Sequence, residues 1–150
     1  MKVLGVNLLQ GELRYSLITG VRGAPQLVDR GRRIVVSEDS PELMDWFEST
    51  FDEIIDSTKP DKLAYRLVLN PKKKQIYNLI FPFAILNLVA HRKKIAISEY
   101  INQNFTPTKF GYPKGEDIYE ICTAVFGEHP PYWDKNQKYS VIVAWLSLSI

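Results

Sequence analysis

The sequence has a single cysteine, Cys122, and only two histidines, His91 and His129, among its 150 residues. One cysteine excludes an intramolecular disulfide, and so few thiol and imidazole groups argue against a structural zinc site. Neither histidine has a serine or cysteine context that suggests a catalytic triad. This composition is typical of proteins in a reducing compartment, so we expect a cytoplasmic location.

The sequence also lacks a hydrophobic run long enough to cross a membrane. Its most apolar segment spans residues 76–89. This segment is interrupted by Asn78, Pro82 and Asn87, and it is shorter than the roughly 20 residues that a bilayer requires. Residues 1–9 are too short for a secretory signal and have no cleavage site. We therefore expect neither a membrane partner nor a signal peptide.

No glycine-rich phosphate loop, Walker pattern or Rossmann pattern is present. The formal net charge is only +2, so a nucleic-acid partner would have to be recognised by local clusters of cations. Residues 72–74 and 92–94 are two such clusters, at opposite ends of one predicted helix. Each is more often a solvated corner than a binding patch.

The length and the hydrophobic content of 45% predict one domain over residues 1–150. Short apolar runs separated by tight turns predict a three-stranded antiparallel meander over residues 2–8, 13–18 and 26–36. A helix should begin at Ser40-Pro41-Glu42, where a capping hydroxyl, a proline and an acid coincide.

Residues 62–69 predict a buried central strand, because they are apolar and bounded by proline on both sides. A helix over 73–90, kinked at Pro82, should lead to a parallel strand at 95–98. A hairpin broken at Pro82 is the alternative. Two more helices are predicted, over 115–126 and from Asp134 onward. The expected fold is α/β, with a mixed five-stranded sheet flanked by helices. Its predicted core includes Phe47, Phe51, Ile54, Leu67, Ile80 and Ile142.

This order of elements resembles the ribonuclease H-like fold, and the local sequence resembles the RuvC-type Holliday-junction resolvase branch and its bacterial relatives. Four stretches carry the resemblance: the opening strand at 2–7, the Pro-Asp lead-in and central strand at 59–66, the strand end at 97–101, and the closing helix at 138–144. The match covers most of the chain as an ordered pattern.

The resemblance implies phosphodiester cleavage by two divalent metals, held by carboxylates on the first strand, the central strand and the last helix. At these positions the chain has Asn7, Arg66 (or Leu67, if the register of the central strand slips by one residue), Asn136 and Tyr139. An asparagine supplies no charge, and an arginine puts a cation where a metal should be. The resemblance therefore implies a degenerate site that cannot hold two metals.

Two of these residues have other interpretations. Asn7 could be a polar residue satisfied inside a sheet, and Arg66 could form an internal ion pair with Glu12 or Glu99 instead of binding a phosphate. The acids nearest the expected site are Glu12, Glu99 and Asp134. They form the alternative of an unorthodox Mg²⁺ or Mn²⁺ site.

The favoured hypothesis is a degenerate module without a cofactor, which binds nucleic acid or a protein of a nucleic-acid-processing assembly. Arg66 would be the forked phosphate contact, and Lys72, Lys73 and Lys74 would be less specific contacts beyond the same strand end. A metal-dependent nuclease with displaced ligands is the second hypothesis. The third is a protein-interaction or homodimerisation module that uses the apolar helix over 76–89. Enzymatic activity stays an open question, with its absence favoured.

Overall fold

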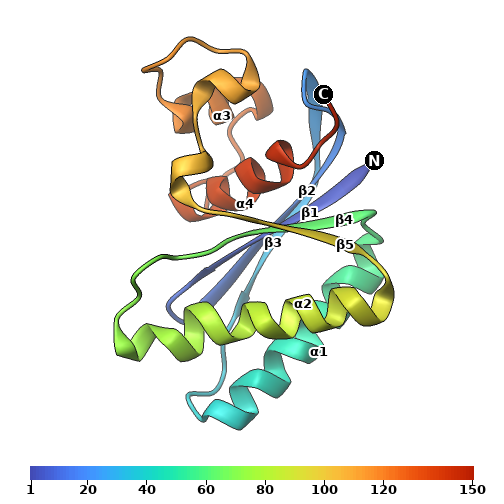
Figure 1. The fold of residues 1–150 in the computed structure, drawn as a ribbon, viewed down its shortest axis with the longest axis vertical. Helices are drawn as coiled ribbons and strands as arrows, with labels where there is room; N and C mark the ends of the chain where they lie inside the picture. Colours follow the sequence, from blue (N-terminus) through green and yellow to red (C-terminus); the bar gives the residue numbers. More distant parts are fainter.

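The computed structural model describes residues 1–150 and places a mixed sheet between two layers of helices (Figure 1). The sheet order is β3-β2-β1-β4-β5; β1, β2 and β3 are antiparallel neighbours, and β4 and β5 continue the sheet in parallel to β1. The predicted fold class is therefore confirmed. The elements are β1 (Lys2–Leu9), β2 (Glu12–Val21), β3 (Ala24–Ile34), α1 (Ser40–Thr58), β4 (Lys62–Arg66), α2 (Phe81–Lys93), β5 (Ala96–Tyr100), α3 (Ile118–Phe126) and α4 (Lys135–Leu146).

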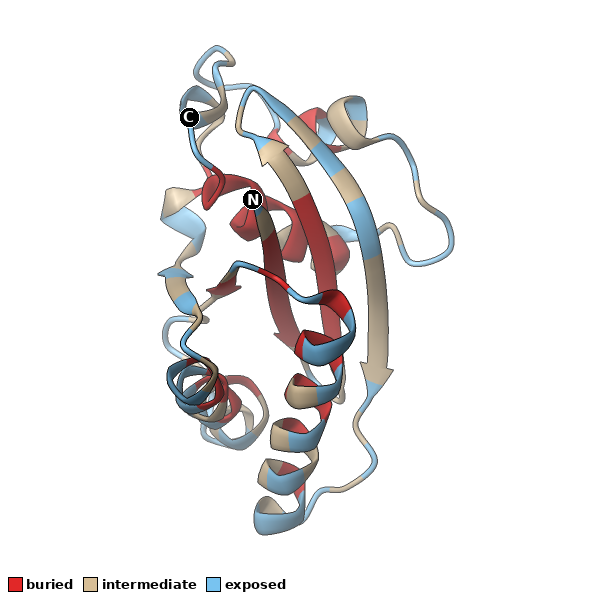
Figure 2. Cartoon of the chain, turned by 90° about the vertical axis from the view of Figure 1, so that its right-hand side faces the viewer, coloured by how far each residue is buried: buried red, intermediate tan, exposed pale blue.

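Alternation along the strands gives the sheet two apolar faces, each covered by its own helices. Leu4, Val6 and Leu8 of β1 belong to the core under α1 and α2, whereas Val3 belongs to the core under α3 and α4. Figure 2 shows that burial is concentrated in the central strands. Asn7 alternates with Val6 and Leu8, so it lies on the face that α4 covers.

Helix α4 packs directly on β1. A Cβ atom at Gly5 would lie 1.9 Å from the backbone oxygen of Ser140, so only glycine allows this approach. Hydrogen bonds fix the same contact: the hydroxyls of Ser16 and Ser140 are 2.6 Å apart, and Gln137 donates to the carbonyl oxygen of Tyr15 at 2.8 Å. These contacts set the position of the first turns of α4 over the sheet.

Most of the predicted core is buried. Phe47, Phe51, Ile54 and Ile142 are each at most 1% exposed. Two members of the predicted set, Leu67 and Ile80, are only partly buried, so these two predictions are wrong. Leu67 lies beyond the end of β4, and the π-helical turn at Ile76–Ile80 changes the helical spacing so that the buried residue is Leu79.

The region between β4 and β5 differs most from the sequence prediction. The central strand ends at Arg66 and not at residue 69. A 3₁₀ turn (Lys73–Gln75) and the π-helical turn then precede α2, which begins at Phe81. Pro82 is the second residue of α2, and the π-helical turn continues directly into this helix, with the amide of Phe81 donating to the carbonyl oxygen of Ile76. Residues 73–93 are helical throughout, so the predicted helix is confirmed and the alternative hairpin at Pro82 is wrong, while the kink stays a prediction.

Three other boundaries are corrected. Strand β5 runs to Tyr100, which brings Glu99 into the sheet. Asp39 caps α1 by accepting from the amide of Glu42, in the role that was assigned to Ser40. Helix α3 begins at Ile118, later than predicted, because Asp117 caps it. No helix has both the length and the apolar character needed to cross a membrane.

Candidate functional site

The structure brings together Asn7, Arg66, Asn136 and Tyr139, the four positions at which the resemblance predicts carboxylates. The Nε of Arg66 donates to Oδ1 of Asn7 at 2.8 Å, and Nδ2 of Asn7 is 3.2 Å from Oδ1 of Asn136. The guanidinium carbon of Arg66 lies 3.9 Å from the ring centroid of Tyr139. These contacts join β1, β4 and α4 at the carboxyl ends of the two parallel strands.

The register of the sheet and the cap of α4 explain this convergence. Val6 is the parallel partner of Tyr65, so the next residue along each strand, Asn7 and Arg66, lie side by side on the α4 face. Asp134 caps α4 through the amide of Gln137 at 3.0 Å. Asn136 and Tyr139 are then one turn apart on the helix surface that faces the strands.

Arg66 has no ion-pair partner, although it lies partly buried. Its Nη1 donates to Oδ1 of Asn102 at 3.1 Å, and its Nη2 has no acceptor in the protein. Desolvation by burial lowers the pKa of Arg66, but an arginine stays protonated at any physiological pH. The alternative of an ion pair with Glu12 or Glu99 is therefore wrong. The site contains one uncompensated positive charge.

The guanidinium borders a cavity of about 310 Å³. Its other lining residues are in the loop after β4 and the turn after β5: Leu67, Val68, Leu69, Asn70, Asn102 and Gln103. The amides of Asn102 and Gln103 were missed at the level of sequence. They could have been predicted from their position directly after β5, because the carboxyl ends of parallel strands lie at the same edge of the sheet.

Two of the three nearby acids are held by arginines of the meander. Glu12 accepts from Nε of Arg14 at 2.6 Å and also from Arg32, and Asp134 accepts from both Nη atoms of Arg14 at 2.9 and 3.1 Å. Burial alone would raise the pKa of Asp134, but the hydrogen bonds from Arg14 and from the amide of Gln137 outweigh it and lower that pKa. Both carboxylates are therefore already paired with guanidinium groups.

The third acid lies on the other face of the sheet. Glu99 is the strand partner of Tyr65 and accepts a hydrogen bond from its hydroxyl, under α2. Burial, together with this hydrogen bond, raises the pKa of Tyr65 to about 12. The sheet therefore separates Glu99 from Arg66.

The residues present do not fit a two-metal centre. No group of three or more His, Cys, Asp or Glu side chains is arranged to hold a metal ion. At the point where metals would be expected, the side chains are two amides, a phenol and a guanidinium.

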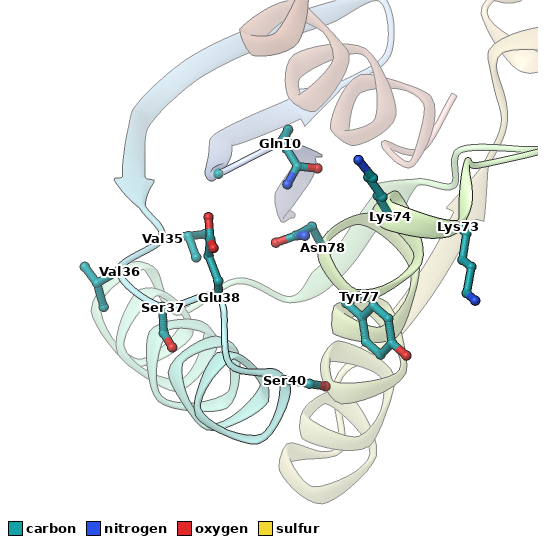
Figure 3. Close-up of a pocket in the computed structure, with 11 residues that line it drawn as sticks. Gln10, Val35, Val36, Ser37, Glu38, Ser40, Lys73, Lys74, Tyr77 and Asn78 are labelled. Carbon is teal, nitrogen blue, oxygen red and sulfur yellow. The ribbon is translucent and has the colours of Figure 1, made fainter.

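The two basic clusters have different surroundings. Lys73 and Lys74 line a separate cavity of about 750 Å³ on the α1/α2 side of the sheet, and so do not border the cavity of Arg66 (Figure 3). In the second cluster, Lys93 pairs with Asp52 and Asp56 at 3.3 and 2.9 Å, which commits its charge to α1. Lys72, Lys73 and Lys74 form no ion pair.

The strand order and the helices on both faces define a ribonuclease H-like fold. Within that class the fold is RuvC-like. RuvC of T. thermophilus in complex with a Holliday junction substrate superposes with a TM-score of 0.76 and 12% identity, over 97% of this chain and 91% of that one. The yeast mitochondrial Holliday junction resolvase Ydc2 superposes with a TM-score of 0.70 and 10% identity, over 96% and 76% of the two chains.

A more distant likeness extends to the Fowlpox virus resolvase in its Holliday junction DNA complex. Its TM-score is 0.57 at 10% identity, over 96% of this chain and 94% of that one. No protein-family model and no curated protein sequence matches the chain. At these identities the likeness establishes the fold, and the chemistry of the site has to be argued from the residues of this chain.

Proposed function

We propose that this protein is a RuvC-like module that binds nucleic acid without metal ions and does not cleave it. The observation that carries the proposal is the uncompensated guanidinium of Arg66, held between Asn7 and Tyr139 where a carboxylate site would be expected. Structural neighbours bind Holliday junction DNA, which makes nucleic acid the first class of ligand to test.

A phosphate group satisfies what the site lacks. Nη2 of Arg66 has no protein acceptor, and the planar guanidinium suits the oxygens of a phosphate. Arg66 also lines a cavity that a ligand can enter. The face of Tyr139 and the oxygen of Asn7 hold the guanidinium in place, so little side-chain entropy is lost when the phosphate binds.

The alternative of a nuclease with displaced ligands has less support. Its three acids are divided between an arginine network and the opposite sheet face. A metal near Asn7 would also be repelled by Arg66 across a short distance.

The test combines binding and cleavage in one set of samples. Short single-stranded, double-stranded and four-way-junction oligonucleotides are titrated with protein in EDTA, and then incubated with Mg²⁺ or Mn²⁺. We expect weak binding that is not sequence-specific, does not need metal and weakens steeply as salt rises, with no cleavage product. Absence of binding even at low salt, or metal-dependent cleavage that is lost on changing Glu12 or Glu99, would overturn the proposal.

One observation favours a second candidate, a protein-interaction or homodimerisation module. Tyr77, Phe81 and Leu88 are 44%, 44% and 40% exposed, and they lie at helical spacing along the solvent face of the π turn and α2. Such an apolar stripe is typical of a surface that packs on another helix. Sedimentation of the wild type and of Phe81→Glu with Leu88→Glu tests it: we expect a concentration-dependent dimer only in the wild type.

A further inference from the structure

The largest cavity of the molecule lies on the sheet face opposite the Arg66 site. Three segments enclose its volume of about 750 Å³: the β1–β2 turn at Gln10 and Gly11, the segment from Val35 to Ser40 before α1, and the helical turns from Lys73 to Asn78. Figure 3 shows the side chains of Gln10, Glu38 and Asn78 converging from these segments. Its volume is within the range of small-molecule sites, about 300–1,000 Å³.

Most of the polar side chains of this cavity have no hydrogen-bond partner within the protein. Gln10, Glu38, Asn78 and Lys74 make no side-chain hydrogen bond and no ion pair within the protein, although their neighbours Ser37 and Asp39 do. Four polar side chains from three segments therefore face one space with no partner in the protein, and those of Gln10, Glu38 and Lys74 are exposed to solvent. Such convergence is what a site with a specific polar ligand requires.

The types of side chain indicate the class of ligand. A carboxylate accepts from the exocyclic amino group of a base, and the amides of Gln10 and Asn78 can pair with a donor and an acceptor on one base edge. Lys74 supplies a positive charge for a phosphate group. The half-exposed ring of Tyr77 at the rim offers a surface for stacking.

We propose that this cavity binds a nucleotide whose base carries an exocyclic amino group, with Glu38 reading that group and Lys74 holding the phosphate. The nucleotide is either free or an unpaired residue of a nucleic-acid strand, since both present the same chemistry. This site is distinct from the Arg66 site, which lies across the sheet and borders another cavity. It goes beyond the proposed phosphate contact because it would distinguish bases.

Titration calorimetry with CMP, UMP and inorganic phosphate tests the free source. A duplex with a single-nucleotide cytidine or uridine overhang, against the blunt duplex, tests the strand source. In one of the two sources, we expect the cytidine ligand to bind about tenfold more tightly than the uridine ligand. The reason is that uracil lacks the exocyclic amino group from which Glu38 would accept a hydrogen bond. Glu38→Gln should remove this preference, and Lys74→Ala should weaken both ligands about tenfold.

Glu128→Gln is the matched control, because Glu128 is an exposed acid without an ion pair and lines neither cavity, and it should leave the cytidine preference unchanged. A preference in CMP identifies a free nucleotide, and a preference only in the overhang identifies an unpaired residue of a strand. No preference in either source, or a preference that survives Glu38→Gln, would overturn the inference. If oligonucleotide binding is lost in Glu38→Gln but retained in Arg66→Ala, the Arg66 proposal is wrong and the present inference is supported.

Discussion

Arg14 and Arg66 project from the same face of the sheet on either side of Asn7, yet their charges are treated in opposite ways. The side chain of Arg14 is 4% exposed and is paired with two carboxylates, Glu12 and Asp134. Arg66 is partly buried and has only amide and aromatic partners. Arginine therefore stabilises the fold on β2, whereas on β4 its charge is available to a ligand.

This difference separates stability from binding. A buried charge with a complete set of partners holds elements together, because removing it strands its partners in a medium of low polarity. A charge that is held in place without an opposite charge contributes less to the stability of the fold. It contributes more to the affinity for an anionic ligand. Arg14 also holds the segment before α4, since it donates to the carbonyl oxygen of Tyr132 at 3.3 Å.

The largest expected effect is on stability, and it contrasts the two arginines directly. Arg14→Met should lower the free energy of unfolding by about 3 kcal/mol, because nearly buried Glu12 and half-exposed Asp134 lose their shared partner. Arg66→Met should cost less, about 1–2 kcal/mol, since it leaves the oxygen of buried Asn7 without a donor and removes the contact with the ring of Tyr139, but leaves no charge unpaired. Urea unfolding of both variants measures this, and equal losses would remove the distinction.

The next effect is on binding and should reverse the order. Arg66→Ala should weaken oligonucleotide binding about tenfold or more and reduce the dependence of log K on log salt by about one counterion. Arg92→Ala is the matched control, because it removes one charge that already pairs with Glu48 at 3.7 Å. Anisotropy at several salt concentrations measures both. An equal loss of affinity in Arg92→Ala would show that the effect comes from net charge and not from a contact at Arg66.

A smaller effect concerns acid pH. The folded pKa of Asp134 is lowered below its usual value near 4, so its contribution is complete above about pH 4 and is lost as pH falls through the folded pKa. Asp134→Asn should therefore flatten the acid limb of the stability curve, and Arg66→Met should leave that limb unchanged. Thermal unfolding between pH 2 and pH 6, in steps of about half a unit, measures the two curves. A limb of unchanged slope in Asp134→Asn would contradict the assignment.

The last prediction is that one substitution, Asn7→Asp, has no effect on metal-dependent behaviour. Asn7→Asp should neither create Mn²⁺-dependent cleavage nor raise the unfolding temperature on adding Mn²⁺, because the new carboxylate would pair with Arg66. Combining it with Arg66→Glu should produce a metal-dependent shift, since two acids then share the site. A shift in the single variant would show that Arg66 does not oppose a cation there.

The sequence predicted the order of the sheet from short-range patterns, and the resemblance predicted four residues that the structure brings together. Alternation in the meander determines which side chains share a face, and the resemblance located Asn7, Arg66, Asn136 and Tyr139 at positions that the structure brings into contact. Which acids approach these residues depends on strand ends and turns, which the pattern leaves undetermined.

Two examples show why. Glu99 was predicted to lie near the site, but it belongs to β5, where the alternation of side chains places it on the opposite face of the sheet. Lys73 and Lys74 were expected beside Arg66, but a 3₁₀ turn and a π turn place them at the other cavity. Neither turn has a hydrophobic period that would reveal it in the sequence.

The most direct measurement follows the Nε–H resonances of the two arginines by NMR while a short oligonucleotide is added in EDTA. Both Nε–H groups are hydrogen-bonded in the protein, that of Arg66 to Asn7 and that of Arg14 to Glu12, which favours their observation. We predict that the Arg66 resonance shifts in proportion to the bound fraction while the Arg14 resonance stays in place. An Arg66 resonance that does not move as the oligonucleotide binds, or equal shifts of both, would contradict a phosphate site at Arg66.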